Sequence, residues 1–195
     1  MKKKYLVIFF ILCALLYVIY NKTNDTKENI LILGDNYLLT DYSYINYFDK
    51  DKYHINTFLY DKITYKQLGV MIKYNDNILI KNKKIYMTQL ISNADIIILN
   101  ANNHEYLNKC VKNNRIFNNY NELMYNNVNT LVNKIKKISN AKIVLLGNFC
   151  NNGAKFYYDG DEIIFVELGS EETDSQIYNK LISQLNYQNW LDFFK

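Results

Sequence analysis

The chain lacks proline altogether, and its 195 residues include only six glycines, three cysteines and two histidines. The missing proline is unusual for a secreted or linker-rich protein. Together with the abundant Asn, Lys, Ile and Tyr residues, it indicates an A/T-rich genome, whose codons favour those four amino acids and disfavour proline. On this interpretation no single asparagine is by itself a sign of function.

Metal-binding side chains are also scarce. There is no Cys-x-x-Cys spacing, and with only three cysteines and two histidines in the chain a structural zinc site is not expected. We therefore expect no metal and no cofactor. Cys13 lies inside an apolar run, which leaves Cys110 and Cys150 for the rest of the chain. A disulfide between these two is permitted outside the cell, but nothing in their spacing demands it.

No long block of positive charge occurs in the body of the chain. The net charge of +4 includes Lys2, Lys3 and Lys4, and the remainder is close to balanced. A nucleic-acid-binding protein normally presents a concentrated basic face, so we expect no nucleic acid partner. With 49% hydrophobic and 22% charged residues, the composition is that of an ordinary globular protein.

The first apolar run, Tyr5–Tyr20, predicts a membrane anchor. As a helix it spans about 24 Å, slightly less than the ~30 Å hydrocarbon core, and flanking lysines and tyrosines extend that span into the interfaces. A cleaved signal peptide and a buried core helix are the alternatives. No small-x-small cleavage site follows the run, and Cys13 lies mid-segment after a bulky leucine, unlike a lipoprotein acceptor.

Charges around this run orient it. Three lysines precede it, whereas mixed charges follow it, and this asymmetry places the amino terminus in the cytoplasm. We therefore expect a single-pass protein of the cell membrane whose domain is extracytoplasmic. The expected organisation is an uncleaved anchor over 1–21, a polar tether over 22–29 and one domain over 30–195.

Past the tether, strand and helix patterns alternate. Helical spacing of apolar residues occurs over Lys62–Tyr74, over Asn121–Ser139 and after Thr173 or Asp174, either of which suits an N-cap. This alternation predicts a three-layer α/β/α domain with a mostly parallel five-stranded sheet. The five expected strands are Ile30–Leu33, His54–Leu59, Asp95–Asn100, Lys142–Gly147 and Ile163–Leu168.

The segment before the fifth strand departs from that alternation. It has no room for a crossover helix, and Lys155–Ile163 is typical of a β-hairpin with Asp159-Gly160 as a type I′ turn. We expect an antiparallel strand near the edge of the sheet.

Polar residues follow two of the buried strands. Gly34-Asp35-Asn36 comes after the first, and Asn100-Ala101-Asn102-Asn103 ends the third. A doubly wound sheet binds its ligands beyond the carboxyl ends of its strands, so these residues are expected to converge on one crevice. The expected pocket consists of Gly34, Asp35, Asn36, Asn100 and Asn102.

The order of these features resembles the SGNH (GDSL) hydrolases, over roughly Asn29 to Asn148. The long helix Asn121–Ser139, followed by Ala141–Asn148, is similar to that family's next segment, in which a helix leads into a strand ending in Gly. In such enzymes a serine after Gly-Asp attacks an ester carbonyl. An oxyanion hole is formed by the serine N–H, a second-block Gly N–H and an Asn side chain, and a C-terminal Asp-x-x-His supplies the base.

Carried over by position, the resemblance is incomplete. Gly34 and Asp35 match and Asn102 matches the oxyanion Asn, but Asn36 stands in the nucleophile's place. Asn100 and Asn103 stand where Gly and Asp are expected. The second-block Gly is expected near Tyr60 or Asp61, and Gly69 lies too far along the next helix to replace it.

The base is missing as well. After Asp174-Ser175-Gln176, Ile177 occupies the histidine position. Of the two histidines, His54 falls inside a strand. His104 follows Asn103 directly and is placed to reach the crevice, although a catalytic role for it is the less favoured interpretation. A carboxamide such as Asn36 cannot be turned into a nucleophile by a neighbouring base, so the site is expected to be catalytically degenerate.

Three hypotheses remain open. The first is a membrane-anchored, inactive SGNH-like domain that binds an envelope glycan or protein. The second is an active ester hydrolase or acyltransferase with a displaced nucleophile, for which Thr40, Ser43 and Cys150 are the candidates, although capping and burial are their more ordinary roles. The third is an unrelated α/β surface protein whose asparagines reflect genomic bias.

Overall fold

The computed structural model describes residues 13, 27–35, 43–80, 83–100, 126–147, 163–168 and 173–193. Apart from Cys13, which is exposed, the predicted anchor 1–21 lies outside these residues, and so does most of the predicted tether. Within the part of the chain that the structure describes, no helix has both the length and the apolar character needed to cross a membrane.

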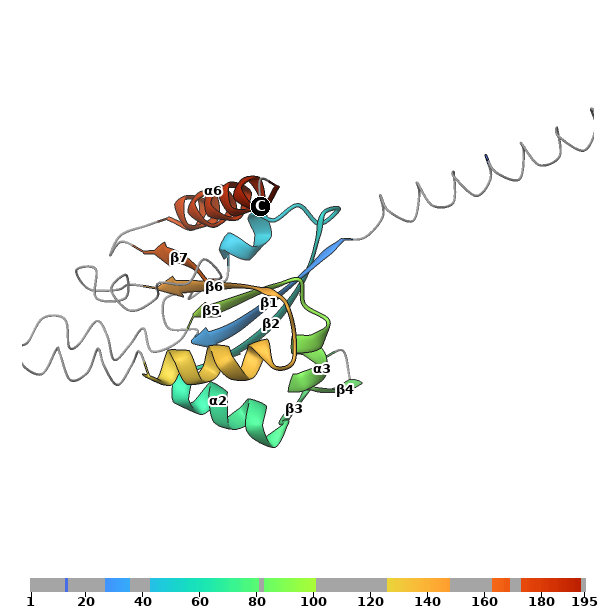
Figure 1. Ribbon diagram of the computed structural model, residues 1–195, viewed down its shortest axis with the longest axis vertical. Coiled ribbons are helices and arrows are strands. Elements are labelled where there is room, and N and C mark those ends of the chain that lie inside the picture. The colour runs from blue at the N-terminus through green and yellow to red at the C-terminus, as the bar shows by residue number, and fades with distance from the viewer. Residues whose placement is uncertain are drawn as a thin grey trace, which may run out of the picture.

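A five-stranded, entirely parallel sheet forms the centre of the domain (Figure 1). All five predicted strands are confirmed, and their spatial order is β2-β1-β5-β6-β7. Their bounds are β1 Glu28–Asp35, β2 Tyr53–Tyr60, β5 Ile96–Asn100, β6 Lys142–Gly147 and β7 Ile163–Glu167.

The apolar strands are continuous because helices cover both faces of the sheet. In β1, Leu31 and Leu33 point into one core, while Ile30 and Ile32 point into the other, and each is at most 2% exposed. Burial on both faces is the usual reason that parallel strands read as unbroken runs of Ile, Leu and Val.

Helices form the two outer layers (Figure 1). On one face lie α2 (Tyr65–Tyr74), α3 (Met87–Ser92) and the helix over 126–136. On the other lie the short 3₁₀ helix η1 (Ser43–Tyr47) and α6 (Asp174–Phe193). The predicted three-layer α/β/α arrangement is thus present, with a sheet that is fully parallel where a mostly parallel one was expected.

Local sequence explains where α2 begins and ends. The Thr64 side chain caps the first turn by accepting from the Gln67 N–H. The Gln67 side chain in turn accepts from the Thr64 backbone N–H at 2.8 Å, which completes a capping box. Asn75 ends the helix in a left-handed conformation, with φ 53° and ψ 48°. Its side-chain oxygen also accepts from the N–H and hydroxyl of Thr88, which ties α2 to α3.

Two features differ from the sequence-based expectation. A hairpin of β3 (Asn77–Ile80) and β4 (Lys83–Tyr86) follows α2 as a separate two-stranded sheet and was not predicted. The expected antiparallel edge strand is wrong for β7, which is the edge strand and runs parallel to β6. The remainder of the predicted hairpin, up to residue 162, lies outside the described residues.

The winding of the chain reverses between β1 and β5. From β1 the chain passes over one face, through η1, to reach β2, and it returns over the other face through α2 and α3 to reach β5. Because the connections leave in opposite directions, the carboxyl ends of β1 and β5 form the topological switch point of the sheet.

Candidate functional site

The candidate site lies at this switch point, where β1 and β5 end side by side. Gly34 is in register with Asn100, and Asp35 is in register with Tyr60 at the end of β2. The structure therefore brings together Gly34, Asp35 and Asn100, as the sequence predicts. Ligands of doubly wound sheets bind beyond such ends, because the connecting loops separate there.

Gly34 is required by the close approach of two backbones. A Cβ atom built on it would lie 1.7 Å from the carbonyl oxygen of Asn100 and 2.9 Å from its Cα. Both are backbone atoms, so no side-chain movement relieves the clash. The absence of a side chain at position 34 therefore sets the separation of β1 and β5 at the floor of the site.

Asp35 holds the neighbouring loop in place. Its side chain is fully buried, and Oδ1 accepts a hydrogen bond from the backbone N–H of Lys62 at 3.0 Å. Lys62 has φ 55°, a conformation that few non-glycine residues adopt. The buried carboxylate thus fixes the turn between β2 and α2, which borders the site. This role was not foreseen from the sequence, because the partner is a backbone group 27 positions away.

Asn100 completes the floor. It is fully buried at the last position of β5, opposite Gly34. A carboxamide donates and accepts hydrogen bonds but does not ionise near neutral pH. Together, Asp35 and Asn100 form a buried polar pair at the carboxyl ends of β1 and β5.

Several predicted site residues lie outside the described part of the chain. These are Asn36, Asn102, Asn103 and His104, and the same holds for Thr40, Cys110 and Cys150. Ser43 is described as the first residue of η1, on the face of the sheet that α6 covers.

The position expected for a catalytic histidine belongs to the apolar core. Ile177 is 6% exposed in α6 and packs in the same cluster as Ile30 and Val144. Thr173 precedes the helix, and the Gln176 side chain accepts from its N–H at 2.8 Å, so the residues around the expected Asp-x-x-His motif serve to start α6.

His54 does not approach the site. It is an exposed residue of β2, in register with Asn29 near the start of β1, and thus lies at the opposite end of the strands from Gly34 and Tyr60.

Gly69 lies within α2 and is buried. Its carbonyl oxygen accepts a hydrogen bond from Lys134 Nζ at 2.7 Å, so it contributes to helix packing. Tyr60, by contrast, ends β2 beside Asp35, is 53% exposed, and has its ring centroid 5.1 Å from that of Phe58. From the sequence, Tyr60 was identified only as a position that lacks the expected glycine. Its exposed aromatic ring at the end of β2 was not predicted.

Among the described residues, no group of three or more His, Cys, Asp or Glu side chains is arranged to hold a metal ion. No known protein family matches the chain, and no curated protein resembles it closely enough to count as a relative.

Proposed function

We propose that the chain is a divergent SGNH-like domain that has lost ester hydrolysis and binds an extracytoplasmic glycan at the crevice beyond β1 and β5. In this proposal the apolar run Tyr5–Tyr20 anchors it in the cell membrane, and the domain lies outside the cytoplasm.

The fold supports the proposal at the level of architecture. Counted within the main sheet alone, the strand order is 2-1-3-4-5, the flavodoxin-like doubly wound order, and SGNH hydrolases share this general plan. The Gly34-Asp35 pair stands at the end of the first strand, at the switch point, where that family carries its nucleophile. Because one fold hosts many functions, this support concerns the location of the site and not its activity.

The burial of Ile177 carries the argument for lost catalysis. A base must reach the nucleophile by a hydrogen bond, whereas Ile177 is an apolar side chain enclosed in the core below α6. In a serine-type triad, loss of the nucleophile or of the base costs on the order of 10⁶ in turnover. Asn36 in place of the serine adds a second loss of the same kind, and the two together leave a pocket without an attacking atom.

The rim of the crevice favours a glycan. Tyr60 presents an exposed ring at the end of β2, and aromatic rings give binding sites large contact areas at a small entropic cost. In our proposal, the amides of Asn36 and Asn102, which follow the ends of β1 and β5 in the sequence, hydrogen-bond sugar hydroxyls. Amide side chains do this in both directions, as donors and as acceptors.

A fluorophosphonate probe applied to the full chain in detergent micelles tests the loss of catalysis. We expect no covalent labelling and no hydrolysis of an activated acetyl ester above the buffer rate. Asn36→Ser restores a hydroxyl but no base, so it is expected to remain inactive as well. Labelling of the natural chain that disappears in Ser43→Ala or Thr40→Ala would overturn the proposal and establish an active hydrolase with a displaced nucleophile.

A further inference from the structure

The edge of the sheet opposite the crevice carries most of the described positive charge. We call it the amino edge, because the five strands begin there, and define it as 27–29, 49–53, 73–77, 83–86, 92–95 and 136–142. Among described residues it holds nine lysines and five carboxylates. The lysines are Lys27, Lys50, Lys52, Lys73, Lys83, Lys84, Lys136, Lys137 and Lys142.

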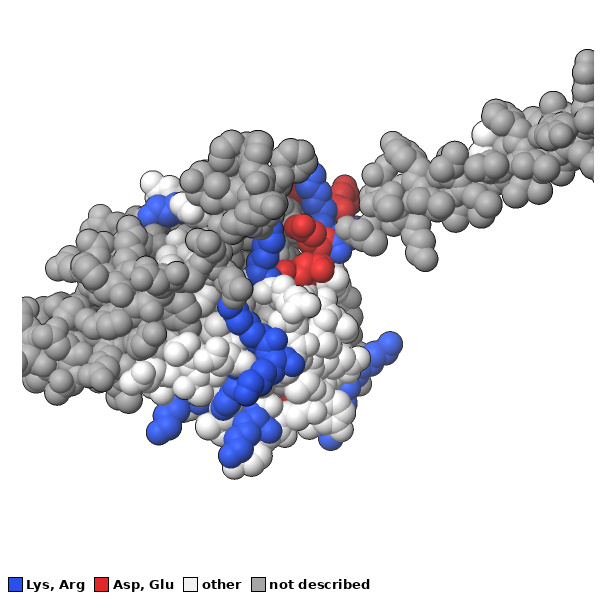
Figure 2. Space-filling view, in the orientation of Figure 1, with Lys and Arg blue, Asp and Glu red and all other residues white. Residues whose placement is uncertain are grey.

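The carboxyl edge has the reverse balance. We define it as 34–35, 60–66, 100, 147, 168 and 173–174, and its described charged side chains are three carboxylates (Asp35, Asp61, Asp174) and two lysines (Lys62, Lys66). The positive charge of the amino edge is not visible as a run in the sequence, because its lysines come from separate segments that the fold brings together. Figure 2 shows lysines in a band across one face and at its margin, with carboxylates gathered near the start of β1.

Two of the five carboxylates of the amino edge accept hydrogen bonds from the backbone, and a third lies beside a lysine. Asp95 Oδ2 accepts from the backbone N–H of Asn29 at 2.8 Å and from its Nδ2 at 3.4 Å. Asp49 Oδ1 accepts from the N–H of Asp51 at 2.8 Å, and Asp51 lies 4.0 Å from Lys27 Nζ. Asp95 and Asp49 thus lie against the backbone near the starts of β1 and β2, whereas the Asp51 side chain is fully exposed. The lysines of β4 and of the 136–142 segment belong to other parts of the edge.

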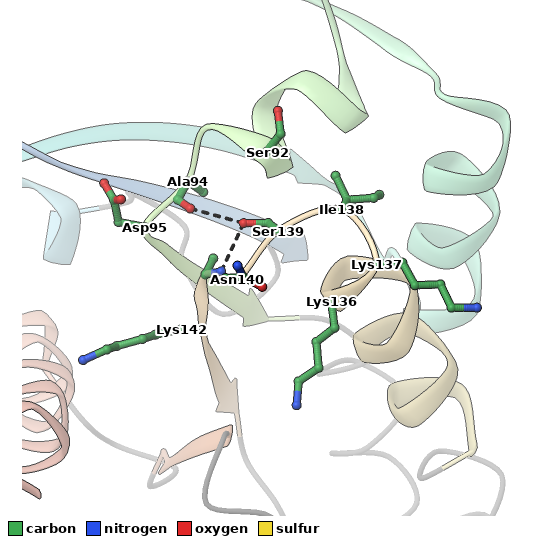
Figure 3. A pocket seen from close by; sticks show the side chains of 10 residues that line it. Ser92, Ala94, Asp95, Lys136, Lys137, Ile138, Ser139, Asn140 and Lys142 are labelled. Carbon is green, nitrogen blue, oxygen red and sulfur yellow. Dashed lines mark hydrogen bonds between the residues drawn. The ribbon is translucent and has the colours of Figure 1, made fainter. Parts of the chain in front are cut away.

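A hollow of about 540 Å³ lies on this edge, where the helix over 126–136 leads into β6. Lys136, Lys137 and Lys142 line it, and Figure 3 shows their side chains pointing in three different directions. The Ser139 hydroxyl, at its centre, is held by bonds to the Ala141 N–H and the Ala94 carbonyl. Lysines that diverge in this way do not enclose one small anion, but they suit negative charges spread over a surface.

Exposed aromatic side chains accompany the lysines. Tyr74 at the end of α2 is 68% exposed and Tyr86 at the end of β4 is 46% exposed, and Asn77, in register with Tyr86, follows Tyr74 by three positions. Lys73 Nζ lies 5.4 Å from the centroid of the Tyr74 ring. Tyrosine together with lysine is the combination enriched at the headgroup level of membranes.

The chain also enters the domain at this edge. Lys27 directly precedes β1, which begins at Glu28. Only residues 21–26 separate Lys27 from the end of the apolar run at Tyr20. Fully extended, six residues span about 20 Å. If the run is in the bilayer, as the proposed function requires, the amino edge is held near the membrane and the crevice faces away from it.

From these observations we propose that the amino edge of the domain docks on the surface of an anionic lipid bilayer, with its lysines over the headgroups and Tyr74 and Tyr86 at the interface. The docking orients the crevice outward, toward the envelope. Attraction of this kind is long-ranged, needs no single stoichiometric site and weakens with salt.

The test uses the full chain reconstituted into vesicles, with Cys13, Cys110 and Cys150 replaced by Ser. A fluorophore is attached either at Ser92→Cys on the amino edge or at Asp61→Cys on the carboxyl edge. Quenching by a headgroup spin-labelled lipid reports which edge lies at the bilayer. One set of vesicles contains phosphatidylglycerol and the other contains only phosphatidylcholine.

We expect quenching at position 92 to exceed that at position 61 by about twofold or more in the anionic vesicles. The excess should fall in neutral vesicles, in about 0.5 M salt, where the Debye length is about 4 Å, and in Lys83→Glu/Lys84→Glu. The matched variant Lys62→Glu/Lys66→Glu makes the same change in charge at the carboxyl edge and should keep the excess quenching at position 92.

Equal quenching at the two positions in anionic vesicles, or an excess that Lys83→Glu/Lys84→Glu leaves unchanged, overturns the docking proposal. The anchor is tested separately: if Tyr5–Tyr20 does not span the bilayer, salt will extract the chain from both kinds of vesicle. Anchored chains without an edge preference would thus refute the docking alone, whereas an edge preference in salt-extractable chains would support docking and refute the anchor.

Discussion

The two edges of one sheet use the same residue types for different purposes. At the carboxyl edge, a carboxylate and a carboxamide are fully buried, and a glycine lets two backbones come into contact. At the amino edge, four of the five carboxylates and eight of the nine lysines are exposed. At the first edge, packing encloses these polar groups, which suits recognition of one ligand. The second offers diffuse charge, which suits attraction to an extended surface.

Gly34→Ala is expected to have the largest effect of any substitution at the carboxyl edge. The new Cβ meets the backbone of Asn100, so β1 and β5 must separate. We expect the free energy of unfolding to fall by about 3 kcal/mol or more, at the upper end of the range for overpacking. Urea unfolding followed by circular dichroism measures it.

Gly69→Ala is the matched control for that substitution. A Cβ there would meet only Lys134 Nζ, at 3.5 Å, an ordinary contact. Since alanine favours a helix interior over glycine by up to about 1 kcal/mol, the control should leave stability unchanged or raise it. If both variants lose equal stability, the special contact assigned to Gly34 is wrong.

A pair of aspartates sharpens the comparison of the edges. Asp35 and Asp95 each accept a backbone N–H near the end of a strand, at 3.0 Å from Lys62 and 2.8 Å from Asn29, but only Asp35 is buried. Asp35→Ala should cost about 2 kcal/mol because the part-buried bond to the Lys62 N–H loses its charged acceptor. Water can replace the acceptor lost in the exposed Asp95→Ala, which should cost less than about 1 kcal/mol. Equal losses in urea unfolding would show that burial does not distinguish the two edges.

The parallel strands could be predicted because their burial leaves a direct trace in the sequence. Ile30–Leu33 and Ile96–Leu99 are unbroken apolar runs, and both are buried on two faces. The β3–β4 hairpin left a weaker trace. Its strands have four residues each: β3 contains only a short apolar run, Ile78–Ile80, and β4 carries two lysines and an exposed tyrosine.

The common location of Gly34, Asp35 and Asn100 was predictable from the sequence, but their contacts were not. Gly34-Asp35 and Asn100 could be placed at one edge because parallel strands end together. What each residue does there depends on tertiary contacts: the approach of Gly34 to the Asn100 carbonyl and the bond from Asp35 to Lys62 join residues far apart in the chain. The lysines of the amino edge could not be grouped from the sequence for the same reason, since the fold brings them together from separate segments.

Tyr60→Ala tests whether ligand recognition is confined to the carboxyl edge. In titrations of the full chain with an N-acetylglucosamine oligomer, we expect affinity to fall about tenfold, equivalent to about 1.4 kcal/mol, because an exposed ring at the rim is lost. Tyr74→Ala removes an even more exposed tyrosine from the amino edge and should leave affinity unchanged. If the natural chain does not bind the oligomer, or if the two variants lower affinity equally, Tyr60 has no specific role in glycan binding.

The smallest expected effect concerns Tyr53, at the start of β2 on the amino edge. Burial raises the pKa of Tyr53 above 10.0, and the charges of Glu28, Tyr178 and Asp49 raise it further. The folded chain therefore keeps this proton when the unfolded chain has lost it. The associated stability is fully present below pH 10.0 and is lost as pH rises through the folded-state pKa.

Tyr53→Phe removes that ionisation, so its stability should decline less steeply than that of the natural chain above about pH 10. Urea unfolding at a series of pH values from about 8 to about 11 measures the two slopes. Tyr74→Phe, which removes the hydroxyl of an exposed side chain, is the control and should follow the natural chain. Parallel curves for Tyr53→Phe and the natural chain would mean that water reaches the Tyr53 hydroxyl in the folded chain. The whole amino edge, including the start of β2, would then be solvated, in contrast to the buried polar groups of the carboxyl edge.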